Sequence, residues 1–152
     1  MTDDVVIRRG QLDDAETLAE FNVAMAWETE RTRLEPATVA RGVQAVLTKA
    51  DYGFYVVAVV EGDVVGALLV TYEWSDWRCG LFWWVQSVYV RPEFRRRSVF
   101  TRLHAFLKDE ASCTPDVCGM RLYVEDSNHA AQQVYAALGM KRTPYHVYEQ
   151  LP

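Results

Sequence analysis

The chain has 152 residues, half of them hydrophobic and 24% charged, and its formal net charge is -5 at pH 7. This length suits one globular domain with its own core, and the negative charge argues against nucleic acid as a partner. The sequence contains no apolar run long enough to span a membrane and no secretion signal. We therefore expect a single domain over residues 1–152, located in the cytoplasm, with no membrane partner.

Cysteine and histidine usage argues against metal sites and disulfides. The three cysteines are odd in number and lack the C-x2-C spacing of zinc and redox motifs. The three histidines are scattered along the chain. No metal is predicted.

The N-terminal third predicts one strand and two helices. The strand is VVIRR, from Val5 to Arg9. Asp13 or Asp14 then provides an N-terminal cap for a helix that continues to about Glu28. After a break rich in charge and threonine, a second helix is predicted from about Ala37 to Thr48.

Three strands are predicted in the middle of the chain. Two β-branched and aromatic runs, Phe54 to Val60 and Val64 to Trp74, are joined by the turn Glu61-Gly62-Asp63 and indicate an antiparallel hairpin. A third strand runs from Trp83 to Val90. It must stop at Pro92, because proline has no N–H group for a strand ladder.

Carboxylates and large aromatic side chains alternate after the hairpin, at Glu73, Trp74, Asp76, Trp77 and Phe82. Aromatic faces and carboxylates both attract cations. This stretch is therefore a candidate for recognising a cationic, partly apolar amine. The alternative is a turn whose tryptophans merely cap the sheet.

Arg95, Arg96, Arg97 and Ser98 stand where the third of these strands is followed by a helix, whose apolar face begins at Val99. The first N–H groups of a helix lack intrahelical partners and attract anions, so this cluster suits phosphate. The alternative is a solvated helix end. Neither GxxxxGK[ST] nor GxGxxG occurs here, which argues against the common nucleotide sites.

The C-terminal third predicts two strands and a helix. A loop from Ser112 to Gly119 leads to a strand from Met120 to Val124. A residue within Asp126 to Asn128 caps a helix that ends at Gly139. Tyr145 to Glu149 is predicted as a closing strand.

Two motifs in this chain resemble those of the GNAT superfamily of acyl-CoA-dependent N-acetyltransferases. The first is V-x-P-x-x-R-R-x-[small]-V-x-x-x-L after a strand, which is similar to the family's [RQ]-x-x-G-x-[GA] loop. The second is N-x-x-A-x-x-x-Y-x-x-x-G-[FM], matched in register by Asn128, Ala131, Tyr135, Gly139 and Met140. Together with the element order, the two motifs cover nearly the whole chain.

The resemblance implies an α+β fold, an α/β sandwich with a mixed, mostly antiparallel sheet flanked by helices. The expected order is β-α-α-β-β-β-α-β-α-β, with a splay between the fourth and fifth strands. Acetyl-CoA is the implied cofactor. The residues implied to bind it are Val88, Tyr89, Val90, Arg95, Arg96, Arg97, Ser98, Val99, Phe100, Thr101, Asn128 and Tyr135.

Ser98 stands where the family usually has glycine, and Phe100 stands where the family usually has glycine or alanine. Amides in ordinary right-handed helical conformation donate hydrogen bonds without glycine, and Phe100 is expected to turn into the core. We therefore expect weakened or rearranged cofactor binding at worst.

The implied reaction moves an acetyl group from acetyl-CoA to a primary amine of a small molecule or peptide, by direct transfer in a ternary complex. Tyr135 is the implied general acid for the departing thiolate, and a strand amide near Val88 polarises the thioester carbonyl. The positions where relatives carry a glutamate base hold Trp84 and Tyr123 here. By its chemistry Glu73 is favoured as the base.

Glu28 and Glu125 are the alternatives for the base. The residues expected to contact the acceptor are Trp27, Glu28, Trp74, Trp77 and Gln86. A homodimer is expected by family habit alone. Two other functions stay open: a non-catalytic acyl-CoA-binding or regulatory domain, and a nucleic-acid binder that uses the arginine cluster.

Overall fold

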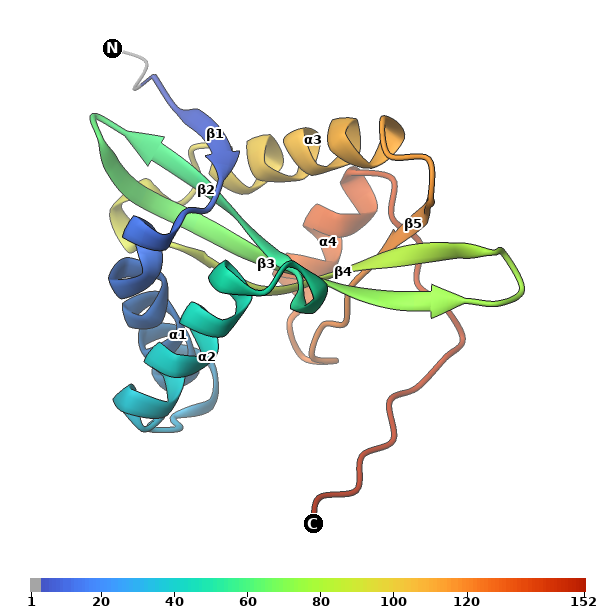
Figure 1. The fold of residues 1–152 in the computed structure, drawn as a ribbon, viewed down its shortest axis with the longest axis horizontal. Helices are drawn as coiled ribbons and strands as arrows, with labels where there is room; N and C mark the ends of the chain where they lie inside the picture. Colours follow the sequence, from blue (N-terminus) through green and yellow to red (C-terminus); the bar gives the residue numbers. More distant parts are fainter. Residues whose placement is uncertain (1–3) are drawn as a thin grey trace.

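The computed structural model describes residues 4–152 as one sheet with helices on both faces (Figure 1). The strands lie in the order β1-β2-β3-β4-β5, and all neighbouring pairs are antiparallel except β4 and β5, which are parallel. The strands are β1 (Val6–Arg9), β2 (Phe54–Val60), β3 (Asp63–Ser75), β4 (Gly80–Val90) and β5 (Val117–Arg121). The helices are α1 (Ala15–Glu30), α2 (Pro36–Thr48), α3 (Val99–Ser112) and α4 (His129–Ala137). The predicted α+β class with a mixed, mostly antiparallel sheet is confirmed.

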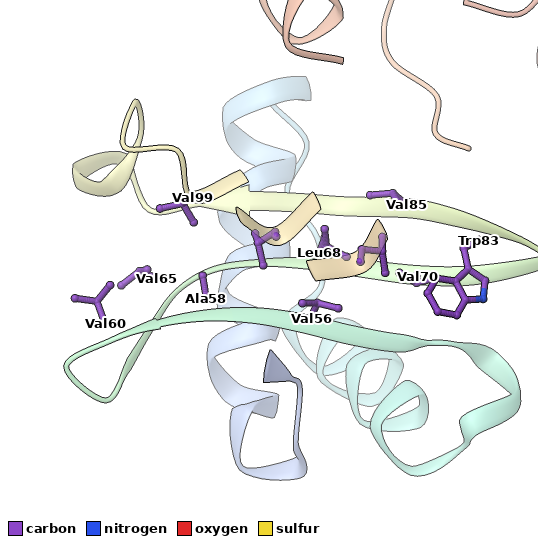
Figure 2. Close-up of a cluster of buried hydrophobic side chains, with 11 residues drawn as sticks. Val56, Ala58, Val60, Val65, Leu68, Val70, Trp83, Val85 and Val99 are labelled. Atoms are coloured by element: carbon purple, nitrogen blue, oxygen red, sulfur yellow. The ribbon is translucent and has the colours of Figure 1, made fainter. Parts of the chain in front are cut away.

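The core lies on both faces of the sheet, because successive residues of a strand point to opposite faces. On one face, strand residues such as Val56, Leu68 and Val85 form a cluster with Leu103 and Leu107 of α3 (Figure 2). On the other face, α1 and α2 cover a second cluster, which includes Leu18, Phe21, Val43, Tyr55 and Val57. Every helix in residues 4–152 is too short or too polar to cross a membrane.

Asp14 occupies the predicted N-cap position of α1, but its side chain bonds elsewhere. After the 3-10 turn Leu12–Asp14, its carboxylate accepts hydrogen bonds from Arg8 at 2.7 and 3.0 Å and from the Gln11 backbone N–H at 2.7 Å. The side chain makes no capping bond to α1 as described. Asp14 therefore joins the end of β1 to the start of α1 instead of capping the helix.

A β-bulge interrupts β4 near its end. Ala67 of β3 pairs with Tyr89, and Leu69 pairs with Gln86, so one residue of β3 faces two residues of β4, Ser87 and Val88. Ser87 has φ 50°, in the left-handed region. A bulge leaves its extra residue outside the ladder and bends the strand.

The ladder between the parallel strands β4 and β5 ends before β4 does. Their ladder runs from the pair Leu81 and Val117 to the pair Trp84 and Arg121, whereas β4 continues to Val90. The bulge lies in the part of β4 beyond this ladder. β4 thus continues past the last residue of β5, and the splay between the fourth and fifth strands stays a prediction.

Both ends predicted for the fifth strand are wrong. β5 begins at Val117, before Met120, and ends at Arg121, before Val124, so the loop after α3 is shorter than expected. The ladder with β4 determines this register, since the Leu81 N–H donates to the Asp116 carbonyl at 2.7 Å and Phe82 pairs with Gly119. The strand propensity of these residues alone cannot predict this register, because the register depends on pairing with β4.

The predicted closing strand at Tyr145–Glu149 is also wrong. Residues 141–152, all of them described, form neither strand nor helix. They lie beside β5 and α4 as far as Val147, and the end of the chain then leaves the body of the molecule (Figure 1). Tyr148 is 98% exposed. The segment has strand-forming residues, but a strand needs a neighbour that pairs with its N–H and C=O groups. The observed element order therefore lacks its last β.

Candidate active site

Ten of the predicted cofactor residues lie in one continuous part of the chain, from the end of β4 to the first turn of α3. The 3-10 turn Pro92–Phe94 leads out of the sheet, and residues 95–98 lead into α3. Arg95, Arg96 and Arg97 are all exposed. We call residues 95–98 the arginine loop.

Ser98 is the N-cap of α3 and has φ 60° and ψ 22°, in the left-handed region. Arg96, two residues earlier, has φ 62°. Glycine adopts this conformation without the clash that a Cβ atom causes. The expectation of ordinary right-handed geometry is therefore wrong at Ser98. This serine has the left-handed backbone that glycine usually adopts.

The start of α3 presents unpaired donors beside positive charge. The Arg102 N–H makes the first bond within the helix, to the Ser98 carbonyl at 3.0 Å. The amides of Val99, Phe100 and Thr101 precede it and have no partner in the helical ladder. The Ser98 hydroxyl makes no capping bond to α3 as described. Together with the arginine loop, this helix start fits a phosphate-bearing cofactor.

The aromatic rings of Phe100 and Tyr135 connect α3 to α4. Their centroids are 5.7 Å apart and their planes are inclined at 68°, an edge-to-face contact. Phe100 packs against the core cluster on the α3 face of the sheet, as expected from its apolar character. Burial raises the pKa of Tyr135, so its hydroxyl keeps its proton at neutral pH.

Asn128 caps α4, since its side-chain oxygen accepts a hydrogen bond from the Ala131 N–H at 3.1 Å. The other half of the same amide group is a donor. Both residues of the second motif that were predicted to bind the cofactor, Asn128 and Tyr135, are thus held on one short helix.

Glu28 connects the end of α1 to the arginine loop. One of its oxygens accepts from the Tyr89 hydroxyl at 3.3 Å, and the other accepts from Arg95 at 2.7 Å. Arg95 also donates from Nε to the Val90 carbonyl at 2.8 Å. Burial and the nearby Glu28 carboxylate raise the pKa of Tyr89, whose ring lies 4.8 Å from that of Phe21. The predicted acceptor residue Glu28 therefore also holds Arg95 of the arginine loop.

Glu73, the favoured base, is held by two neighbours. Its Oε1 accepts from Arg121 at 2.8 Å, and its Oε2 accepts from the Trp84 indole N–H at 3.0 Å. The Arg121 guanidinium lies 3.7 Å from the centroid of Phe82. Sequence reasoning missed Arg121, because only the pairing of β4 with β5 places it opposite Trp84.

The aromatic and acidic stretch of the β3–β4 hairpin divides between the two faces of the sheet. Glu73 pairs with Phe82, and Trp74 pairs with Leu81, so Glu73 and Trp74 point to opposite faces. Trp77 lies in the turn and is 86% exposed. The structure therefore does not bring these residues together as one amine-binding cluster.

Gln86 and Trp27 lie at different ends of the predicted acceptor region. The Gln86 amide donates to the Thr71 hydroxyl across β3 and β4, directly before the bulge. Trp27 is exposed near the end of α1, with the guanidinium groups of Arg31 and Arg33 at 5.3 and 5.0 Å from its ring. Two cationic side chains of the protein itself thus already lie near the Trp27 ring.

Comparison with known proteins decides the family. The model of the Acetyltransferase (GNAT) family matches residues 14–140. A solved structure described as a possible acetyltransferase from Clostridium difficile 630 is 40% identical, with a TM-score of 0.91 and 97% of each chain covered. The chain belongs to the GNAT acetyltransferase family. No curated protein matches the sequence.

Two solved structures at lower identity share the fold. A ribosomal-protein-alanine N-acetyltransferase from Brucella melitensis biovar Abortus 2308 is 17% identical, with a TM-score of 0.78 and coverage of 97% of this chain and 98% of that one. A glucosamine-6-phosphate N-acetyltransferase from Arabidopsis thaliana is 18% identical, with a TM-score of 0.74 and coverage of 97% and 99%. Their acceptors differ in kind, so the fold alone does not name an acceptor.

This GNAT protein also has an open hollow of about 1350 Å³ between the second half of α3, β5, α4 and the segment after α4. Tyr135 lines this hollow, whereas the arginine loop does not. Among residues 4–152 no group of three or more His, Cys, Asp or Glu side chains is placed to hold a metal ion.

Proposed function

We propose that this GNAT protein moves an acetyl group from acetyl-CoA to a primary amine of a small molecule or peptide, by direct transfer while both are bound to its single domain. The observation that carries the proposal is the start of α3. There a left-handed Ser98, unpaired helix amides and the arginine loop combine donors with positive charge.

Acetyl-CoA, when bound, supplies the activated acetyl group. The arginine loop and the amides of residues 98–101 hold its phosphates, while Val88–Val90 and Asn128 contact its pantetheine arm. The bulge at Ser87 supports this assignment, because it takes one residue out of the β3–β4 ladder in the part of β4 beyond its ladder with β5. An amide freed in this way is the donor that a thioester carbonyl requires.

Two side chains move protons in the proposed reaction. Tyr135 holds the proton that the departing thiolate takes, and its raised pKa keeps this proton in place at neutral pH. Glu73 takes a proton from the incoming ammonium. A carboxylate has about four lone-pair sites, and Arg121 and Trp84 use two of those on Glu73.

The residues proposed to contact the acceptor are Trp27, Glu28, Trp74, Trp77 and Gln86. A cationic acceptor agrees with the chain's net charge of -5. The homodimer and the cytoplasmic location stay predictions.

A non-catalytic acyl-CoA-binding domain is the second candidate function. The strained backbone at Ser98 and the Phe100 ring in place of a small residue favour it.

Calorimetric titration with acetyl-CoA tests the cofactor site. We expect Arg96→Ala to raise the Kd about tenfold or more, since charged hydrogen bonds contribute roughly 1.5–3 kcal/mol. Arg41→Ala on α2, another exposed arginine, is the matched control and keeps the affinity. Absence of acetyl-CoA binding to the unmodified protein contradicts both candidate functions.

Thiol release with a panel of primary amines separates the two candidates. The enzyme releases coenzyme A only when an acceptor is present, and Tyr135→Phe lowers kcat about 100-fold or more without changing the acetyl-CoA affinity. Tight acetyl-CoA binding with no amine-dependent release across the panel favours the non-catalytic domain.

A further inference from the structure

Three strands present a polar and aromatic surface on one face of the sheet. Thr71 of β3 pairs with Trp84 of β4, and Trp84 pairs with Arg121 of β5. Paired residues point to the same face, and Glu73 joins them because its carboxylate accepts hydrogen bonds from both Trp84 and Arg121. We call these four residues the hairpin face. It lies on the side of the sheet that α1 and α2 cover, but these helices do not extend over the hairpin end of β3 and β4 (Figure 1).

Arg121 is held in a fixed orientation on the hairpin face. Its guanidinium lies 3.7 Å from the centroid of the Phe82 ring, and its Nη1 donates to Glu73 at 2.8 Å. A Cβ atom at Gly119 would lie 2.8 Å from a carbon of the Phe82 ring, so glycine leaves the space that this ring needs. The Arg121 side chain is 24% exposed. Stacking and the ion pair thus orient the guanidinium before any ligand arrives.

Arg121 keeps hydrogen-bond donors for a ligand. A guanidinium carries N–H groups on every nitrogen, and within residues 4–152 the Arg121 side chain makes one hydrogen bond, to Glu73. The exposed Arg78, 5.0 Å from the Phe82 ring, adds a second positive charge at the edge of the hairpin face. The two guanidinium groups together outweigh the single carboxylate of Glu73. The hairpin face therefore attracts a planar anion that accepts two hydrogen bonds from one guanidinium, as a carboxylate does.

Aromatic rings lie beside Arg121. The ring centroids of Trp84 and Tyr123 are 5.4 Å apart, and Tyr123 is 62% exposed. The ring of Tyr145 lies 5.9 Å from the Arg121 guanidinium. Aromatic rings provide large apolar contact area for a ligand. The hairpin face thus offers a cationic group next to apolar surface.

We propose that Arg121 binds a carboxylate of the acceptor, while Trp84 and Tyr123 contact its apolar part. The acceptor is then an amino acid or a short peptide with a free carboxylate. This inference rests on the proposed function, because it names the class of amine that receives the acetyl group. A phosphate group carries about two negative charges at neutral pH, which the neighbouring Glu73 carboxylate repels more strongly than one. The hairpin face therefore favours the carboxylate.

Calorimetric titration tests the carboxylate site without acetyl transfer. The ligands are L-phenylalanine, L-leucine and trialanine, each compared with its C-terminal amide, which keeps the amine and lacks the carboxylate. Titrations with and without coenzyme A make the result independent of the cofactor. At least one carboxylate should bind about tenfold or more tightly than its amide, because charge-assisted hydrogen bonds are the strong ones. Arg121→Gln should remove this preference, and Arg121→Lys, which keeps the charge without the planar fork, should keep part of it.

Arg41→Gln on α2, at an exposed arginine, is the matched control and should keep the full preference. Circular dichroism verifies that each variant is folded. The inference is overturned if no carboxylate binds, if every carboxylate binds like its amide, or if the preference persists in Arg121→Gln. O-Phosphoethanolamine provides the phosphate comparison, and tighter binding of this amine than of all three carboxylates overturns the assignment as well. Amine-dependent release of coenzyme A is measured separately, so its absence contradicts the proposed function and not the carboxylate site.

Tyr123→Ala tests the apolar part of the site. Loss of the ring should weaken the binding of L-phenylalanine and of its amide by the same factor, about three- to tenfold, because the aromatic contact does not involve the carboxylate. Trialanine has no ring and should change less than about twofold. Tyr52→Ala, at another exposed tyrosine, is the control and should keep all affinities. Unchanged L-phenylalanine binding in Tyr123→Ala overturns the aromatic contact.

Discussion

Phe100 meets Tyr135 edge to face, with 5.7 Å between the ring centroids. The residue that replaces a small amino acid of the resembled motif thus contacts the residue proposed to hold the catalytic proton. Aromatic pairs of this geometry contribute about 0.5–1.5 kcal/mol beyond the burial of their area. We therefore expect the start of α3 and the middle of α4 to be energetically coupled.

A double-mutant cycle measures this coupling. Phe100→Ala should lower the free energy of unfolding by about 2 kcal/mol, because a half-buried ring loses part of its packing. Combined with Tyr135→Leu, the two losses should fall short of additivity by about 0.5–1.5 kcal/mol in urea denaturation. Strictly additive losses contradict a direct contact.

Ser98→Gly should stabilise the protein. With φ at 60°, Ser98 carries a Cβ atom in a conformation that costs about 1–2 kcal/mol for L-residues, and glycine loses part of that gain through its larger chain entropy. The expected net gain is about 0.5–1 kcal/mol, measured by urea denaturation. Ala105→Gly, an exposed site within α3, is the control and should lose about 1 kcal/mol. A loss at both sites disproves strain at Ser98.

Glu73→Gln and Arg121→Gln distinguish a base from a structural ion pair. If Glu73 takes the proton, Glu73→Gln should lower kcat about 100-fold, while Arg121→Gln changes kcat less than about tenfold. If Glu73 only positions Arg121, both variants should lower kcat to the same extent. Steady-state kinetics with one primary amine provide the readout.

Asp14→Asn should remove part of the acid sensitivity of the fold. The hydrogen bonds from Arg8 hold the pKa of Asp14 below its usual value, so Asp14 stabilises the protein above the unfolded pKa near 4. This contribution is lost as the pH falls through the lower folded pKa. We expect Asp14→Asn to lose about 2 kcal/mol at pH 7 and to show a flatter dependence below about pH 4. Asp13→Asn, at an exposed neighbour, should change neither quantity.

The sequence predicts the elements whose pattern is local. The hairpin of β2 and β3, the end of β4 before Pro92 and a cap of α4 within residues 126–128 all follow from turn, proline and capping chemistry. The separation of Glu73 from Trp74 was predictable in the same way, because neighbours in a strand face opposite sides.

Other features depend on long-range pairing that propensity does not contain. The start of β5 is determined by its register with Leu81, and residues 145–149 form no strand because no strand in the described residues pairs with them. Arg121 reaches Glu73 only through that same register. The residue types also do not indicate the left-handed backbone at Ser87 and Ser98, because both positions carry serine instead of glycine.

The extra residue at Ser87 reverses the phase of β4. Before the bulge, the odd-numbered residues Trp83 and Val85 face α3; after it, Val88 and Val90 do so, and Tyr89 turns to α1. If the same residues paired with β3 in a regular ladder without the bulge, Tyr89 would face the α3 layer, away from Glu28. The extra residue at Ser87 thus determines which helix layer, α3 or α1, each side chain at the end of β4 faces.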